Sequence, residues 1–316
     1  MTSMSSICSV GHLALDYILG LPKFSEHESE VVDLNYFTRE YGGVAGNMAV
    51  ISRHLGLNAS VCSYIGKDLY GLMYLRYLKE LDIDVSQVRI VDEETPKAVF
   101  LINESENVKK QYFYEGVSPV INMPSSEWLN KHDLVYLATK HVVDTLNFLR
   151  IIDKSKTLTA VDPWLYVNHV TSQELREILS KTDVLFVRNE LQDKILKLAG
   201  MKSIEELQNL GVSIIVKTMG KEGSITYYKQ GLKGKQLYTP ALTEIAVKKV
   251  YPSGAGDGYR SGFLTALLKG FSIEEASQIG AVVATFVLQQ PGIQTRIPTW
   301  KQVLEFYKEI KKSGIL

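Results

Sequence analysis

The sequence has little cysteine, no net charge and no long apolar run. Its two cysteines, Cys8 and Cys62, lie far apart in strand-like stretches, so buried thiols of a reducing compartment are expected rather than a disulfide. Lys and Arg number 35, as do Asp and Glu, so no global field draws the protein to nucleic acid or to an anionic membrane. No apolar run approaches the length of a membrane span and residues 1–10 lack a signal-peptide pattern, which predicts a cytoplasmic protein.

Common ligand-binding patterns are missing as well. The six histidines never fall at H-x-H or H-E-x-x-H spacing, and C-x-x-C does not occur, so a metal held by His or Cys is not expected. The turn MGKEGS lacks the GxxxxGK[ST] of a P-loop. The alternating Gly254, Gly256 and Gly258 do not form the GxGxxG of a dinucleotide-binding turn. Both common nucleotide-binding fingerprints are therefore absent.

The chain does contain an alternation of β-branched or aromatic runs with helical patterns. Strands are predicted at residues 7–12, 59–66, 133–139, 157–162, 183–189 and 212–218, and helices at 46–57, 69–83, 144–153, 172–180 and from about 190. Three more helices are predicted between 254 and about 310. This rhythm predicts an α/β fold with helices on both faces of a mostly parallel sheet. No linker or repeat interrupts it, so residues 1–316 are expected to form one domain.

Two segments without helical patterns interrupt the alternation, at residues 17–37 and about 95–120. In the second, KAVFLINESENVKKQYFYEG predicts two strands around a polar turn. A small antiparallel sheet built from both insertions is expected to lie over the large domain as a lid.

A glycine turn with a carboxylate precedes the first C-terminal helix. The strand-like VKKVY is followed by Ser253-Gly254-Ala255-Gly256-Asp257, whose backbone N–H groups would form an anion nest at a helix N-terminus. The helix dipole favours ionised Asp257, which could accept a proton from a hydroxyl while the nest stabilises a transferring phosphoryl group. A small-molecule kinase needs this pairing. The alternative is that Asp257 only caps the helix in a tight turn.

Four separated motifs resemble the ribokinase-like (PfkB) carbohydrate and nucleoside kinases. They are Asp16 in GHLALDYI, the pair Gly42-Gly43 with Asn47, the turn KTMGKEG, and GAGDGYRSGF, in matching order over essentially the whole chain. The segments TPKA and IQTRIPTW are most similar to the archaeal nucleoside kinases of this family. The resemblance implies a three-layer α/β/α sandwich with a small antiparallel β lid, which often forms a dimer contact.

The resemblance also implies roles for the acceptor and transfer groups. Asp257 matches the base that deprotonates the attacking hydroxyl, and the anion hole around the γ-phosphate of ATP matches Gly254, Ala255 and Gly256. The positions that bind sugar hydroxyls match Asp16, Gly42, Gly43 and Asn47. In the lid, Tyr112, Phe113 and Tyr114 would pack against a nucleobase or, equally well, in a dimer interface.

On the nucleotide side, the matching positions are Asn189, Thr218, Gly220 and Gly223, although KTMGKEG is also consistent with a plain turn between strands. Mg²⁺ is implied as the cofactor, with ATP as co-substrate. Two residues depart from the family pattern. Gln192 stands where a Glu usually organises Mg²⁺, so the metal ligands stay unknown unless Glu190 or Asp193 compensates. Tyr251 stands where an Asp helps to bind a monovalent cation, which predicts no K⁺ requirement.

Three functions follow as hypotheses. The main one is an ATP-dependent kinase that phosphorylates the 5′-hydroxyl of a ribonucleoside and dimerises through its lid. The second is a sugar kinase acting on ribose, fructose or a phosphosugar. The third is a nucleoside or sugar sensor without turnover, suggested by Gln192 and Tyr251 but opposed by the intact GAGD.

Overall fold

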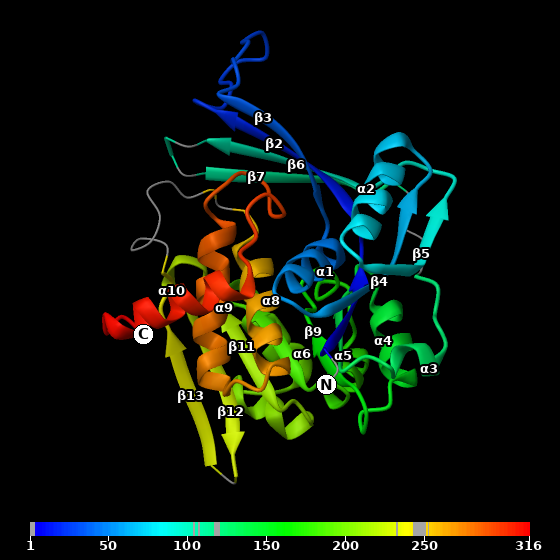
Figure 1. Cartoon of the computed structure of the whole chain (residues 1–316), viewed down its shortest axis with the longest axis vertical. Coiled ribbons are helices and arrows are strands. Elements are labelled where there is room, and N and C mark those ends of the chain that lie inside the picture. The colour runs from blue at the N-terminus through cyan, green and yellow to red at the C-terminus, as the bar shows by residue number, and fades with distance from the viewer. Residues whose placement is uncertain are drawn as a thin grey trace.

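A large α/β body carries a small, four-stranded sheet at one end (Figure 1). This computed structural model describes residues 4–103, 105–106, 108–116, 121–231, 233–242, 251 and 253–316. The predicted strand VKKVY falls mostly on residues 243–250, outside the described residues, as do Pro252 and half of the predicted ESEN turn.

Nine strands form the large sheet in the order β13-β12-β11-β10-β9-β8-β1-β4-β5. The seven strands from β5 to β11 pair in parallel, whereas β12 and β13 are antiparallel. The sequence predicted a mostly parallel sheet but did not identify β5, β12 or β13. The strand bounds are β1 Ser6–Gly11, β4 Asn58–Gly66, β5 Asp84–Val91, β8 Leu134–Ala138, β9 Leu158–Val161, β10 Val184–Arg188, β11 Ile214–Thr218, β12 Ser224–Gln230 and β13 Lys233–Thr239.

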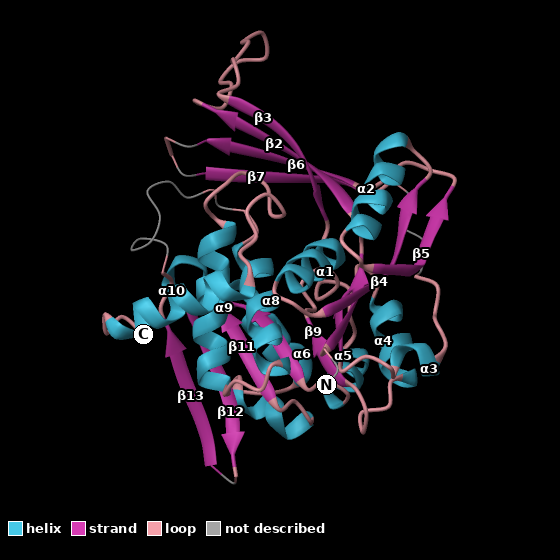
Figure 2. Cartoon of the chain, in the orientation of Figure 1, coloured by secondary structure: helices cyan, strands magenta, loops and turns pink. Residues whose placement is uncertain are grey.

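Helices cover both faces of this sheet (Figure 2). One face carries α1 (Val44–His54), α2 (Leu69–Glu80), α8 (Ala255–Leu268), α9 (Ile273–Val287) and α10 (Trp300–Lys312). The other carries α3 (Ser126–Leu129), α4 (Val142–Ile151), α5 (Ser172–Ser180) and α6 (Gln192–Ala199), together with the 3₁₀ turns η1 (Asn189–Leu191) and η2 (Glu205–Leu210). The predicted three-layer α/β/α arrangement is confirmed.

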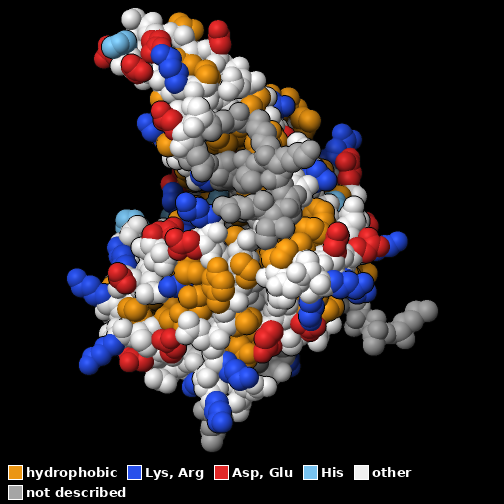
Figure 3. Space-filling model, turned by 90° about the vertical axis from the view of Figure 1, so that its left-hand side faces the viewer, with side chains coloured by type: hydrophobic (Ala, Val, Ile, Leu, Met, Phe, Trp, Pro, Cys, Tyr) orange, Lys and Arg blue, Asp and Glu red, His pale blue; other side chains and the backbone are white. Residues whose placement is uncertain are grey.

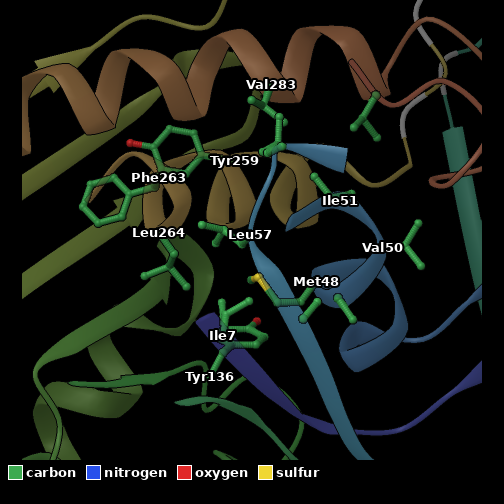
Figure 4. Packing of buried hydrophobic residues seen from close by; sticks show 14 of the residues in the cluster. Ile7, Met48, Val50, Ile51, Leu57, Tyr136, Tyr259, Phe263, Leu264 and Val283 are labelled. Atoms are coloured by element: carbon green, nitrogen blue, oxygen red, sulfur yellow. The ribbon is translucent and has the colours of Figure 1, made fainter. Parts of the chain in front are cut away.

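Each layer has its own apolar core because neighbouring residues of a strand point to opposite faces. Ile7 and Tyr136 belong to one core, and their neighbours Cys8 and Val135 belong to the other. Figure 4 shows the first core, where Met48 of α1 lies near residues of α8 and the sheet. In the second core the thiols of Cys8 and Cys62 lie 3.9 Å apart as buried free cysteines, as predicted.

The small sheet has the strand order β3-β2-β6-β7, with bounds β2 Ala14–Leu21, β3 Tyr36–Gly42, β6 Lys97–Asn103 and β7 Val108–Tyr114. Its first two strands extend beyond the predicted segment 17–37 at both ends. The outer pairs are antiparallel, as predicted for the small sheet, whereas the central strands β2 and β6 pair in parallel. β2 and β6 are parallel because of the connectivity. β2 follows β1, β6 follows β5, and β1 and β5 run in the same direction in the large sheet.

The surface carries charge of both signs. Figure 3 shows Lys, Arg, Asp and Glu side chains scattered over the face in view, without a large area of one sign. Among the described residues, no helix is long and apolar enough to cross a bilayer.

Candidate functional site

The polar residues of the site lie at the carboxyl ends of the parallel strands. His12 follows β1, Asp162 follows β9, Arg188 ends β10 and Thr218 ends β11. The strand order reverses at β1, since β4 lies on one side of it and β8 on the other. Open α/β sheets form a crevice at such a point, and the crevice here lies beneath the small sheet.

The turn before α8 brings backbone into this crevice. Gly254 is the N-cap of α8 and has φ +86°, a conformation that L-residues rarely adopt. A Cβ at Gly254 would also lie 2.4 Å from the Ile293 side chain. Both constraints require glycine, and the first N–H groups of a 14-residue helix are left available at this point.

Two cavities meet at this turn. The first, which we call the α8 cavity, has a volume of about 560 Å³ and is lined by the ends of β10 and β11, the turn at 218–224, residues 239–242, the start of α8 and one side of α9. The second, the small-sheet cavity, has a volume of about 390 Å³ and lies between the small sheet, α1 and the strand ends. Five residues line both cavities: Lys109, Arg188, Gly254, Asp257 and Arg260.

Asp257 is held at the junction of the two cavities by two side chains, Asn47 and Arg260. Its Oδ2 accepts a hydrogen bond of 2.9 Å from Asn47 Nδ2, and its Oδ1 lies 3.5 Å from Arg260 Nη1. Arg260 in turn pairs with Asp162 at 2.7 Å, and both side chains are almost fully buried. Burial raises the pKa of Asp257, whereas Arg260, Asn47 and Arg188 act to lower it. The helix dipole, which was the only effect considered from the sequence, favours the ionised form of Asp257, and burial opposes it.

Asp16 and the glycine pair lie at the base of the small sheet. The Asp16 side chain packs so closely against Gly42 that a Cβ there would lie 2.2 Å from the carboxylate, so only glycine fits. Burial, followed by repulsion from Asp257 and Glu40, raises the pKa of Asp16 to about 8. In the ligand-free protein this carboxyl group is therefore mostly neutral at pH 7.

A hydrogen-bonded chain fixes the Asn47 amide. Gln294 Nε2 donates to Asn47 Oδ1 and to the Tyr74 hydroxyl, each at 2.9 Å, and that hydroxyl donates to the Gly42 carbonyl. Because Asn47 Oδ1 accepts from Gln294, its amide nitrogen is directed at Asp257. Both Gln294 and Tyr74 were missed from the sequence.

Most predicted residues come together here. Of the acceptor-side set, Asp16, Gly43 and Asn47 line the small-sheet cavity, while Gly42 lies directly behind Asp16. On the nucleotide side, the α8 cavity is lined by Thr218, Gly220, Gly223, Gly254, Ala255, Gly256 and Asp257. Asn189 lines neither cavity, nor does Gln192, whereas Glu190 lines the α8 cavity.

The three aromatic residues of β7 separate by face. Phe113 lines the small-sheet cavity, and its ring lies 5.3 Å from that of His12. Tyr112 and Tyr114 are more than half exposed and line neither cavity. Side chains alternate along a strand, so Phe113 faces the small-sheet cavity while Tyr112 and Tyr114 face away from it.

Sequence reasoning missed the cations of the site. Arg188, Arg260 and Lys109 line both cavities, and Lys140 lines the small-sheet cavity. A signal for Arg188 was present, because it ends a predicted strand and such ends meet at the ligand-binding edge. Lys109 carries no comparable signal, since its position depends on how the small sheet lies over the body.

The residues at the α8 cavity suit Mg²⁺ accompanied by phosphates. Within the described residues, no three His, Cys, Asp or Glu side chains gather as a ready metal site. Mg²⁺ commonly needs only one or two carboxylates when phosphates and water complete its shell. Glu190 and Asp257 are the carboxylates that line this cavity. A carboxylate at a nest of N–H groups, between two cavities, suits transfer of an anionic group from one ligand to a hydroxyl of another.

Comparison with known proteins identifies the family. Residues 4–300 match the pfkB family of carbohydrate kinases. The chain is similar to the nucleoside kinases of Methanocaldococcus jannaschii (33% identity; 96% of both chains) and Methanothermobacter thermautotrophicus (30%; 94% of both). It is also similar to the ATP-dependent 6-phosphofructokinase of Thermoanaerobacterium thermosaccharolyticum (23%; 97% of this chain and 94% of the other). The crystal structure of the M. jannaschii nucleoside kinase superposes with a TM-score of 0.82 at 31% identity, over 97% of this chain and 99% of the other.

The fold and the family match are those of kinases that phosphorylate a hydroxyl group of a small molecule. The chain belongs to the pfkB family. The ribokinase-like fold and the phosphotransferase class expected from the motifs are therefore confirmed.

Proposed function

We propose that the chain transfers the γ-phosphoryl group of ATP to the 5′-hydroxyl of a ribonucleoside, with Asp257 as the general base. The observation that carries this proposal is that Asp257 and Gly254 line both cavities. A hydroxyl in the small-sheet cavity and a phosphate in the α8 cavity would meet at the carboxylate, where in-line attack requires them. Asn47 and Arg260 hold the carboxylate in position.

The lining of the small-sheet cavity supports a nucleoside acceptor. His12 and Phe113 form an edge-to-face pair at its wall, and Trp164 and Phe100 add further rings. Burial and Lys140 lower the pKa of His12 to about 4, so its imidazole is neutral at pH 7. The buried Nδ1 of His12 has no hydrogen-bond partner within the described part of the chain. A neutral ring nitrogen beside aromatic faces suits a nucleobase. Asp16 and Asn47 would bind the ribose hydroxyls.

A second candidate acceptor is a phosphosugar. Lys109, Lys140 and Arg188 all line the small-sheet cavity, and three cations suit an acceptor that already carries a phosphate. The similarity to a 6-phosphofructokinase agrees with this candidate. Lys140 is already paired with Glu115, however, which leaves it less able to bind a second anion.

For the ions, we infer that Mg²⁺ accompanies ATP and that K⁺ is not required. Mg²⁺ would screen charge on the phosphates, and Glu190 would approach it directly or through water, in place of the usual Glu at position 192. The Tyr251 ring lies 6.0 Å from the Tyr36 ring of the small sheet. A phenol in an aromatic contact offers no carboxylate for a monovalent cation.

The outer face of the small sheet supports dimerisation. Phe37, Tyr112 and Tyr114 are each more than half exposed there. Exposed aromatic residues on one face are typical of interface cores, so two copies would associate through this sheet. Light scattering coupled to gel filtration would detect the dimer, and Tyr112→Ser with Tyr114→Ser should shift it to monomer.

An acceptor panel tests the proposed reaction. ADP formation would be measured with purine and pyrimidine ribonucleosides, their 5′-deoxy analogues, ribose, fructose and fructose 6-phosphate. Turnover of ribonucleosides but not of their 5′-deoxy analogues is expected, with product mass fixing one added phosphate. Turnover of fructose 6-phosphate alone would replace the proposed acceptor by the second candidate. Binding of a nucleoside or sugar without ADP formation would favour a sensor instead.

A further inference from the structure

Arg188 is a partly buried cation that the described residues leave without an anionic partner. Its guanidinium makes no hydrogen bond or ion pair with any described group, and it lies at the end of β10, where both cavities meet. A guanidinium carries five N–H donors in one plane, and leaving them unpaired beside a cavity costs free energy. Such a group is expected to bind an anion when the cavities fill.

Trp164 fixes the orientation of this guanidinium. The Arg188 Cζ lies 3.9 Å from the centre of the Trp164 ring, within the range of a strong cation–π contact. This contact uses the positive charge and not the N–H donors of the guanidinium, so the donors remain available for hydrogen bonds. Trp164 itself lines the small-sheet cavity, so the pair forms part of the wall at the junction.

Arg260, the other guanidinium at the junction, is already engaged. It pairs with Asp162 at 2.7 Å and lies 3.5 Å from Asp257, and its side chain is only 2% exposed. Arg260 therefore contacts both buried carboxylates, and its single positive charge offsets one of their two negative charges. Burial and repulsion from Arg260 lower the pKa of Arg188, whereas Asp162, Asp257 and Glu190 act to raise it from a distance, without a direct contact to its N–H groups. An incoming anion would relieve this repulsion, which none of the groups already present achieves fully.

We propose that the Arg188 guanidinium, held over the Trp164 ring, contacts the phosphoryl group during its transfer from the α8 cavity to the small-sheet cavity. This inference rests on the proposed phosphoryl transfer but not on which acceptor is used. In that step the bond from the γ-phosphorus to the bridging oxygen breaks and leaves ADP. A bond from phosphorus to the acceptor oxygen forms, and the hydroxyl proton passes to Asp257. Arg188 donates hydrogen bonds to the non-bridging oxygens throughout and gains or loses no proton.

Charge on these oxygens is redistributed during transfer. A hydrogen-bond donor at the junction therefore stabilises the transition state more than it stabilises either ligand in its bound ground state. Arg188→Gln should therefore lower kcat by about 10²- to 10³-fold, the scale of losing one such charged donor, while both KM values stay within about threefold. Arg188→Lys should be intermediate, because a lysine keeps the charge but not the planar guanidinium. Trp164→Leu should lower kcat less, through orientation alone.

Two further readouts separate this role from a structural one. Added guanidinium ion should partly restore turnover to Arg188→Gly but not to Asp257→Asn. Calorimetry with ADP, Mg²⁺ and aluminium fluoride, a probe for the planar phosphoryl group, should show binding weakened at least tenfold in Arg188→Gln while binding of ADP and Mg²⁺ alone is unchanged. Arg150→Gln provides the matched control, because this arginine pairs with Glu177 on the surface and should alter neither reading.

The outcomes also separate failure of this inference from failure of the proposed function. If Arg188→Gln raises only the KM of a phosphorylated acceptor, Arg188 binds the acceptor's own phosphate and the inference is overturned. Unchanged kcat and unchanged binding of the fluoride complex would overturn it too. If the wild-type protein uses a sugar rather than a nucleoside, the proposed function fails. A loss of kcat and of fluoride-complex binding in Arg188→Gln would still support the contact of Arg188 with the transferring phosphoryl group.

Discussion

The raised pKa of Asp16 predicts a stability effect that is independent of turnover. The folded protein keeps this carboxyl group protonated up to about pH 8, whereas the unfolded chain releases its proton near the ordinary 3.8. The folded state therefore binds more protons than the unfolded state across this window. By linkage, the free energy of unfolding falls as pH rises from about 4 to about 8.

The magnitude follows from the two pKa values. Between pH 5 and pH 8, the Asp16 contribution lowers the free energy of unfolding by about 3.6 kcal/mol, since one pKa unit corresponds to about 1.4 kcal/mol. Taking an unfolding entropy of about 2 cal/mol/K per residue, this is a loss of roughly 5 °C in Tm. The sign of the effect is fixed by burial, which is the largest cause of the shift.

Asp16→Asn tests this reasoning because asparagine resembles the neutral acid and does not titrate. The Tm of the variant minus that of the wild type should grow by about 5 °C from pH 5 to pH 8, measured by differential scanning fluorimetry without ligands. Asp33→Asn, which removes an exposed carboxylate, serves as the control for loss of one charge. A Tm difference for Asp16→Asn that stays constant from pH 5 to pH 8 would refute the raised pKa.

Four other predictions address the site. Asp257→Asn should lower kcat by about 10²-fold or more with little change in acceptor binding. In the wild type, kcat/KM should fall on the acid side at a pH above 3.8, because burial raises the pKa of Asp257. Turnover near the wild-type rate in Asp257→Asn would show that Asp257 is not the general base. Gln294→Leu frees the Asn47 amide and should lower kcat/KM about five- to tenfold, which is the value of one hydrogen bond. The acid limb of the kcat/KM profile should also move to higher pH. An unchanged acid limb would exclude a positioning role for Gln294. Arg260→Met should cost about 3–5 kcal/mol in denaturant unfolding, and adding Asp162→Asn should recover part of it; additive losses would contradict coupling. Replacing Na⁺ by K⁺ should change turnover less than twofold, and strong activation would show that the contact of Tyr251 does not exclude a K⁺ site.

Local sequence patterns predicted the large domain because burial dictates them. Parallel strands covered on both faces are nearly continuous apolar runs, and β1, β4, β8, β10 and β11 all have this pattern. β5 and β13 were missed because they lie at the two edges of the sheet, where many of their residues are exposed and polar. Edge strands carry a weaker apolar signal than central strands.

The site was predictable where its chemistry depends on backbone and hidden where it depends on distant side chains. Gly254 and Gly42 are visible in sequence because a close approach or a positive φ demands glycine. The hydrogen-bonded chain from Gln294 through Asn47 to Asp257 joins residues that are 247 and 210 positions apart in sequence, and no local pattern encodes it. Asn189, which was matched by motif alone, lines neither cavity, while its neighbour Glu190 lines one.

The charges at the junction explain why both sides of the cleft are needed. Asp16, Asp162 and Asp257 bring three carboxyl groups close together, and Arg260 and Arg188 supply two cations from the body. The small sheet then contributes Lys109, which lines both cavities. With Asp16 largely neutral at pH 7, these described groups sum to a positive charge where the phosphates would enter. If the acceptor hydroxyl binds against Asp16 as proposed, it would change that carboxyl group's surroundings, and the acceptor and the phosphate would then be coupled electrostatically as well as by position.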